Sequence, residues 1–276
     1  MKNILVPVNE SDGLPSMIET AVLVAEMFEG HIEGLRVRQD TSAVLAADDL
    51  GAASPALLEN FDREEAERGR RAREVFEGYL QGRHRDGGGR FTSSWLQVNA
   101  SDTDVGGHGR LFDVIVVGRP TRARTSPPVS VLEAALFETG RPILIAPPTP
   151  PVGLGKEVVI AWNGSTETAL TIAHGMPYLA RARQITVLTI EGGTVPGPTG
   201  TEVAAKLRRH GFAVDAVTTP PNGRSVGEAI LEEAGRLGAD LLLKGGYTQS
   251  RLRQMIFGGA THHILAEATL PVLMAH

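Results

Sequence analysis

The chain carries the same strand-forming segments twice, in the same order, and this duplication limits its possible folds more than any other feature. An apolar run that ends at Asn9 returns as one that ends at Asn163, and in both copies a serine follows two residues later. Two later segments repeat as well, 113–118 as 240–245 and 142–146 as 271–275. Three matches in one order indicate two domains of one fold, and the chain is long enough to hold both.

The boundary between the copies is marked by proline. The run Pro-Pro-Thr-Pro-Pro at 147–151 cannot continue a sheet or a helix, because proline has no backbone N–H and a fixed φ. We therefore expect a first domain over 1–147, a linker over 148–156 and a second domain over 157–276.

Strand and helix patterns alternate within the second copy. Apolar runs predict strands at 158–162, 185–190, 213–217, 241–243 and 271–275, and helical spacing predicts helices at 167–180, 203–210, 226–237 and after 259. This alternation predicts an α/β fold in which each domain is a five-stranded parallel sheet with helices on both faces. The loops after the first and fourth strands then meet at the carboxyl edge of the sheet.

The first copy differs in having a longer middle. Apolar residues recur at helical spacing there, among many charged ones, at Leu58, Phe61, Ala72, Phe76 and Leu80. The pattern predicts a long, charged surface helix that packs along one side.

Composition excludes several classes of function. A net charge of −5 argues against general nucleic-acid binding, and the absence of cysteine excludes disulfides, thiolate zinc sites and cysteine nucleophiles. We find neither an apolar run of membrane-spanning length nor a signal-peptide pattern, so we expect a cytoplasmic protein without membrane or nucleic-acid partners.

Two glycine pairs, at 245–246 and 258–259, flank a polar loop between a predicted strand and a predicted helix. Glycine lets backbone N–H groups approach an anion, and a helix N-terminus adds unpaired donors and a favourable dipole. The pattern is typical of a phosphate-binding loop, although a tight strand-to-helix turn is the alternative interpretation.

These segments resemble the universal stress protein family in its tandem two-domain form. The resemblance rests on the strand that ends in Asn163-Gly164-Ser165, the glycine loop that runs through Ser250-Arg251, and the closing strand at 271–275. It covers essentially the whole chain, more strongly over 157–276 than over 1–147. It implies a Rossmann-like fold of the adenine nucleotide alpha hydrolase type. It also implies ATP or another adenine nucleotide as ligand, with or without Mg.

Members of this family that bind ATP share a pattern of glycine, two residues, glycine, nine residues, glycine, and serine or threonine. Gly245 and Gly258 match the first and third glycines, whereas Thr248 replaces the second and Gly259 replaces the hydroxyl residue. Thr248 disfavours a positive φ but offers a hydroxyl, while Gly259 keeps its N–H and lacks the hydroxyl.

Other side chains can compensate for these two departures. Ser250 and Thr261 offer hydroxyls and Arg251 a charge for the phosphates, and Asn163 stands where the family has an aspartate near the ribose or adenine. Lys244 is expected either to contact phosphate or to face solvent. The candidate nucleotide-binding residues are Ala161, Trp162, Asn163, Gly164, Ser165, Ile190, Gly245, Gly246, Thr248, Gln249, Ser250, Arg251, Gly258, Gly259, Ala260 and Thr261.

The first domain loses this pattern. Gly118 survives, but Arg119-Pro120-Thr121 follows it, and Pro127-Pro128 restricts the loop and removes backbone donors. We expect Arg119, Arg122 and Arg124 to form a solvated basic loop, and the domain to be a structural or regulatory partner that does not bind ATP.

Three classes of function remain. The first is a universal stress protein whose second domain binds an adenine nucleotide in a stress-response or regulatory role, with an unidentified regulatory protein as partner. The second is an interaction scaffold with silent sites, which Thr248 and Gly259 favour. The third is a slow ATPase, for which the sequence shows no general base and no clear magnesium ligands, so no catalytic residue is predicted.

The resemblance also implies how the halves associate. The closing strands at 142–145 and 271–274 are expected to pair within the chain as a pseudo-dimer, which covers their apolar edges. A further homodimer is left open. His174, His262 and His263 have no partner at metal-ligand spacing, so no metal site is predicted.

Overall fold

The structure is a computed structural model that describes residues 1–38, 55–85, 87, 89–99, 104–119, 128–246 and 259–276. Its strands are β1 (Asn3–Pro7), β2 (His31–Arg38), β3 (Thr92–Asn99), β4 (Val114–Gly118), β5 (Ile143–Ala146), β6 (Glu157–Ala161), β7 (Gln184–Ile190), β8 (Val214–Thr219), β9 (Leu241–Leu243) and β10 (Val272–Met274). Its helices are α1 (Leu14–Phe28), α3 (Pro55–Arg85), α4 (Asp104–Gly109), α5 (Val129–Glu138), α6 (Thr166–Leu179), α7 (Gly200–Arg208), α8 (Val226–Arg236) and α10 (Ala260–Glu267).

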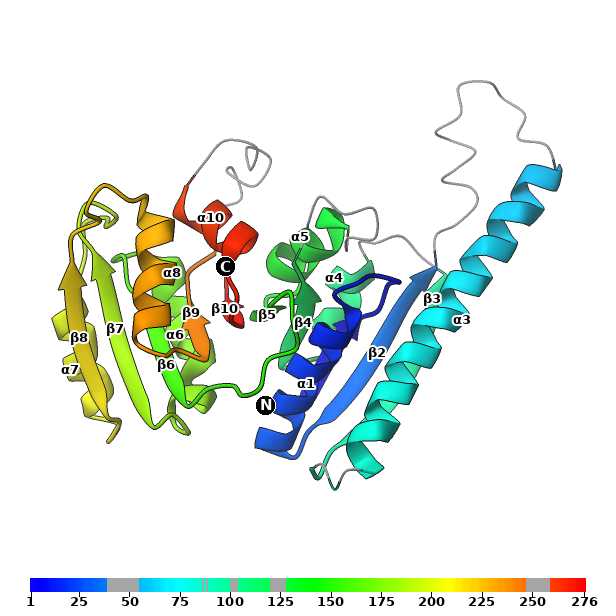
Figure 1. Cartoon of the computed structure of the whole chain (residues 1–276), viewed down its shortest axis with the longest axis horizontal. Helices are drawn as coiled ribbons and strands as arrows, with labels where there is room; N and C mark the ends of the chain where they lie inside the picture. Colours follow the sequence, from blue (N-terminus) through cyan, green and yellow to red (C-terminus); the bar gives the residue numbers. More distant parts are fainter. Residues whose placement is uncertain (39–54, 86, 88, 100–103, 120–127, 247–258) are drawn as a thin grey trace.

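The strands form one ten-stranded sheet in the order β3-β2-β1-β4-β5-β10-β9-β6-β7-β8 (Figure 1). Strands β1 to β5 make a first half and β6 to β10 a second half, and pairing within each described half is parallel. The halves meet where β5 and β10 pair antiparallel, with Leu144 opposite Leu273. The predicted α/β fold with mostly parallel pairing is confirmed.

Hydrogen bonds repeat between the halves as the duplicated sequence does. The Asp113 carboxylate accepts from two backbone N–H groups at the start of β1, at 2.5 and 3.0 Å, and Asp240 accepts from two at the start of β6, both at 3.0 Å. The strand registers also match: Ile4 of β1 lies opposite Val114 of β4, and Val158 of β6 lies opposite Leu241 of β9. Residues 4–11 therefore correspond to 158–165, and 114–118 correspond to 241–245.

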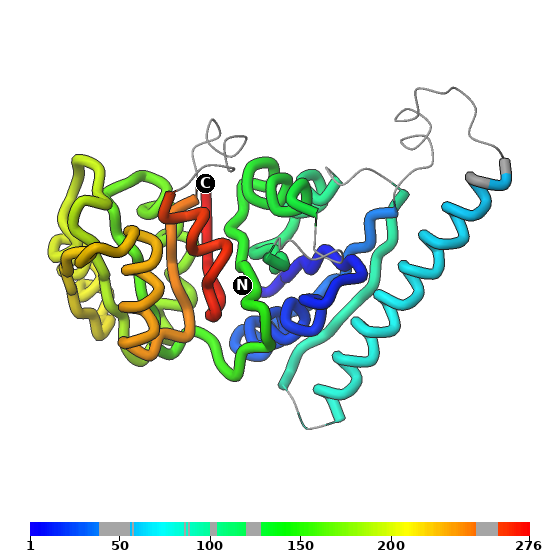
Figure 2. Tube along the Cα trace, turned by 45° about the horizontal axis from the view of Figure 1, so that its top comes forward, coloured from blue at the N-terminus to red at the C-terminus, as the bar shows by residue number. Residues whose placement is uncertain are grey.

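Helices cover both faces of the sheet (Figure 2). Buried residues of α1, α3, α6 and α7 form one apolar cluster with the strands, and those of α4, α5, α8 and α10 form another. Among the described residues, no helix has the length and apolar character needed to cross a membrane.

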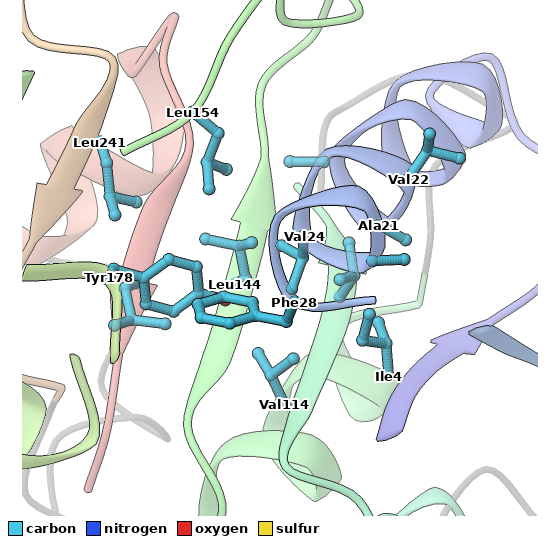
Figure 3. Packing of buried hydrophobic residues seen from close by; sticks show 14 of the residues in the cluster. Ile4, Ala21, Val22, Val24, Phe28, Val114, Leu144, Leu154, Tyr178 and Leu241 are labelled. Atoms are coloured by element: carbon cyan, nitrogen blue, oxygen red, sulfur yellow. The ribbon is translucent and has the colours of Figure 1, made fainter. Parts of the chain in front are cut away.

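The two halves share one core at their junction. The rings of Phe28 on α1 and Tyr178 on α6 meet edge to face with their centroids 5.4 Å apart, and Leu144, Leu154 and Leu241 lie around them (Figure 3). Because all five side chains are at least nine-tenths buried, separating the halves would expose a large apolar surface to water.

Helix α3 is the long charged helix that the sequence predicts. Its residues Ala72, Phe76 and Leu80 are buried and it packs along α1 and β2. The same helix face also makes a polar contact that the apolar pattern does not predict. The Glu65 carboxylate lies 2.7 Å from an Arg36 nitrogen of β2, and both side chains are about 95% buried. Arg36 also donates to the Asn9 side-chain oxygen at 2.6 Å, so this ion pair connects α3 with the end of β1.

The Arg36–Glu65 pair provides a test of the packing of α3. We expect Arg36→Ala to lower the free energy of unfolding by about 3 kcal/mol in urea denaturation, because removing one partner of a buried pair leaves a buried charge. Arg70→Ala, which removes only exposed pairs on α3, is the control and should leave the curve nearly unchanged. If the two changes lower the free energy of unfolding equally, the buried pair stabilises the fold no more than the exposed pairs do.

Candidate functional site

The candidate site lies at the carboxyl edge of the sheet in the second half. Strands β6 and β9 are neighbours there and end at this edge, and α10 begins beside it (Figure 1). The loop after β6, the segment 244–246 after β9, and the first residues of α10 supply the predicted site residues that the structure describes.

Asn163 and Ser165 fix the first turn of α6. The Asn163 side-chain oxygen accepts from the Ser165 backbone N–H at 3.2 Å and from the Thr168 hydroxyl at 2.7 Å. The Ser165 hydroxyl in turn accepts from the Thr168 N–H at 3.2 Å and caps the helix. The amide oxygen of Asn163 is thus occupied within the protein. Among the described residues no partner takes its NH₂ group, which is the part of the side chain that can contact a ligand.

Glu167 is the acidic residue of the same helical turn. Its own backbone N–H and the hydroxyls of Ser165 and Thr166 hold the pKa of its carboxyl group below the usual value, against the opposing effect of burial. The carboxylate is therefore ionised near neutral pH and is held by the helix N-terminus.

Gly245 and Gly246 are required by close packing. A Cβ at Gly245 would lie 2.6 Å from the Thr168 backbone nitrogen, and one at Gly246 would lie 2.9 Å from the Ala275 carbonyl oxygen. The Gly246 N–H donates to that same carbonyl at 2.9 Å. Close packing against α6 and the end of β10 thus requires glycine at both positions, and the Gly246 N–H already has an acceptor.

Gly259 begins α10 with a backbone conformation that suits glycine alone. Its φ of +119° lies in a region that side chains with a Cβ rarely adopt, and as a glycine it has no side chain to cap the helix. The backbone bonding of the helix starts with the His263 N–H, which donates to the Gly259 carbonyl. The preceding N–H groups of α10 have no acceptor within the helix, and within the part of the chain that the structure describes this helix N-terminus favours an anion.

Lys244 places a buried cation at this edge. Its side chain is buried, and the ammonium group donates to the Gly245 carbonyl at 3.1 Å. Burial lowers the pKa of this amine to about 8, while the nearby Glu167 carboxylate acts in the opposite direction. The solvent-facing alternative for Lys244 is therefore wrong, because only 6% of the residue is exposed.

Three other predicted residues belong to the core. Ala161, Trp162 and Ile190 are buried, and the Trp162 indole N–H donates to the Pro198 carbonyl at 2.8 Å.

The segment that follows β7 packs over the loop after β6, which the sequence did not indicate. The Val195 N–H donates to the Asn163 carbonyl at 2.8 Å, and a Cβ on Gly164, whose φ is +84°, would lie 2.6 Å from the Val195 oxygen.

Ala260 and Thr261 lie in the first turn of α10, with Thr261 buried. The predicted residues Thr248, Gln249, Ser250, Arg251 and Gly258 lie outside the described residues.

Within the described residues, the corresponding edge of the first half holds a small pocket. It has room for about one water molecule. The pocket is lined by Pro7, Asn9, Ser11, Met17, Val117, Gly118, Pro128, Val131 and Leu132.

Arg119, at the same edge of the first half, contacts the other half. It donates to the carbonyl of Ala268, at the end of α10, at 2.9 Å, and the residue is partly exposed. Arg122 and Arg124 lie outside the described residues, so the solvated basic loop stays a prediction.

Comparison with known proteins finds likenesses in sequence and, separately, in fold. Residues 162–276 match the model of the "Universal stress protein family". Over 47 residues, the chain is 38% identical to the stress response protein NhaX of Bacillus subtilis (strain 168), and this match spans 17% of the chain and only 28% of that protein.

Two solved structures share the fold over nearly the whole chain. A universal stress protein from Archaeoglobus fulgidus DSM 4304 superposes with a TM-score of 0.69 at 14% identity, covering 99% of this chain and 95% of that one. A putative universal stress protein from Pseudomonas aeruginosa UCBPP-PA14 gives 0.53 at 16% identity, covering 100% and 93%.

The packing of Gly245 against α6 can be tested by adding one methyl group. We expect Gly245→Ala to lower the free energy of unfolding by about 1–3 kcal/mol, since its Cβ would overlap the first turn of α6. Gly235→Ala is the matched control: it lies on an exposed helix position with nothing within 4 Å of its Cβ, and should stabilise slightly. Thermal denaturation measures both effects. If the two changes shift the free energy of unfolding in the same direction, Gly245 is not required by its packing against α6.

Proposed function

Because residues 162–276 match the model of the universal stress protein family, we propose that the second half of the chain binds ATP or a related adenine nucleotide in a stress-response or regulatory role. The nucleotide occupies the carboxyl edge where β6 and β9 end, and the first half serves as a structural partner.

The observation that supports this proposal most directly is the bare N-terminus of α10 at that edge. Gly259 has no side chain to cap the helix, so among the described residues the first N–H groups of α10 are available to a phosphate. In the first half, α5 begins after Pro128, which has no N–H and lines a pocket with room for about one water molecule. This difference favours one nucleotide per chain.

Binding without rapid turnover is the role that the described side chains favour. Glu167, the carboxylate beside the site, is held by its own helix turn, and the Asn163 oxygen is engaged by Ser165 and Thr168. Neither group is positioned as a free base for an attacking water molecule. A magnesium ion would accompany the nucleotide through its phosphates.

A scaffold without nucleotide is the second candidate, and the packing of the edge favours it. The segment after β7 already packs on Gly164, and Gly245 and Gly246 already contact α6 and the end of β10. In this alternative, the glycines and Asn163 serve only the fold.

Calorimetric titration with ATP separates the two candidates. We expect the wild type to bind one ATP per chain and Gly259→Ala to weaken binding about tenfold, because the variant cannot keep the φ that opens α10 toward the ligand.

The matched control for this titration is Gly211→Ala. Gly211 has a φ of +83°, free space around its Cβ, and a position at the opposite edge of the sheet, between α7 and β8. The Gly211→Ala variant should lose about as much stability as Gly259→Ala but bind ATP like the wild type. If the wild type gives no heat of binding with ATP, the scaffold is favoured. If Gly259→Ala binds ATP as tightly as the wild type does, the N-terminus of α10 does not contribute to the site.

A further inference from the structure

We propose that Lys244 binds a phosphate of the ligand through its ammonium group and thereby restricts this site to phosphorylated compounds. The inference rests on the proposed function and adds to it the residue that senses ligand charge.

The duplicated register locates the Lys244 side chain. Since 114–118 correspond to 241–245, Lys244 occupies the position that Val117 has in the first half. Val117 lines the pocket at the carboxyl edge there. Three of its neighbours in that lining also have counterparts beside Lys244, namely Asn9, Ser11 and Gly118 as Asn163, Ser165 and Gly245. Lys244 therefore projects from the same strand end toward the equivalent crevice.

Two further lining positions also change from apolar to polar between the halves. By the same register Met17 corresponds to Thr171, and by the pairing of the closing strands Leu132 corresponds to Thr261. The Thr171 hydroxyl accepts from the Ala275 N–H at 3.1 Å and lies 3.5 Å from the Lys244 carbonyl oxygen, so it braces the strand end that carries the lysine. Three apolar positions of the first half, Val117, Met17 and Leu132, are thus occupied by Lys244, Thr171 and Thr261 in the second.

A buried ammonium group needs more partners than Lys244 has. Lysine offers three donors, and the Gly245 carbonyl takes one; within the described part of the chain, no other acceptor lies within hydrogen-bond distance. Burial disfavours the charged form, which the lowered pKa of the amine reflects. Valine satisfies the fold at the equivalent position, so the fold itself does not require a lysine here. A phosphate oxygen supplies both the missing acceptor and the missing negative charge.

A series of ligands that differ only in charge tests this role. Adenosine, AMP, ATP and inorganic triphosphate are titrated calorimetrically into the wild type, Lys244→Met and Lys244→Arg. We expect Lys244→Met to weaken AMP, ATP and triphosphate about tenfold to a hundredfold and to leave adenosine unchanged. Lys244→Arg should retain part of the affinity for the phosphorylated ligands.

Controls keep the test independent of folding. Removing a buried charge should leave the thermal midpoint of the unliganded Lys244→Met protein equal or higher. Lys206→Met, on an exposed position of α7, should bind all four ligands like the wild type.

The outcomes separate this inference from the proposed function. Unchanged affinity of Lys244→Met for AMP and ATP, or an equal loss for adenosine, overturns the role of Lys244 while nucleotide binding stands. Binding of triphosphate that depends on Lys244, without any binding of adenosine, AMP or ATP, supports Lys244 as an anion ligand and overturns the nucleotide proposal. If none of the four ligands binds the wild type, both fail.

Discussion

The antiparallel pairing of β5 with β10 is the contact on which the rest of this architecture depends. It turns two parallel five-stranded halves into one sheet and covers two apolar strand edges. It also sets the carboxyl edge of each half against the amino edge of the other. The end of α5 therefore reaches the candidate site. Leu136 lies against Gly246, and the rings of Phe137 and His276 meet edge to face with their centroids 4.8 Å apart. The first half thus helps to shape the site of the second.

The fold could be predicted because its determinants are local and appear twice. Apolar runs with correct spacing define the strands, and Asp113 and Asp240 stand where each fourth strand begins and accept from the start of the first strand. The stripe of Ala72, Phe76 and Leu80 likewise defined α3 before any partner was known. Errors were confined to the ends of elements, as at α7, which begins at Gly200 behind a Thr199 capping box and not at 203.

The site was predicted less completely because its chemistry depends on partners far away in the sequence. The burial of Lys244, the contact between Arg119 and Ala268, and the Arg36–Glu65 pair each join elements that the chain pattern does not relate. The duplicated sequence does carry one sign of the unusual lysine, because Lys244 stands where the equivalent strand of the first half ends in Val117. The roles of Thr248, Ser250 and Arg251 remain predictions from the family motif.

The central claim is that one half of a duplicated fold kept a ligand site and the other filled it with hydrocarbon. A crystal structure with a nonhydrolysable ATP analogue tests this most directly. The account predicts one analogue per chain at the carboxyl edge of β6 and β9, with a phosphate within hydrogen-bond distance of the Lys244 ammonium group and of the first N–H groups of α10. An analogue bound at the edge of β1 and β4, or an unoccupied second half at saturating concentration, would contradict it.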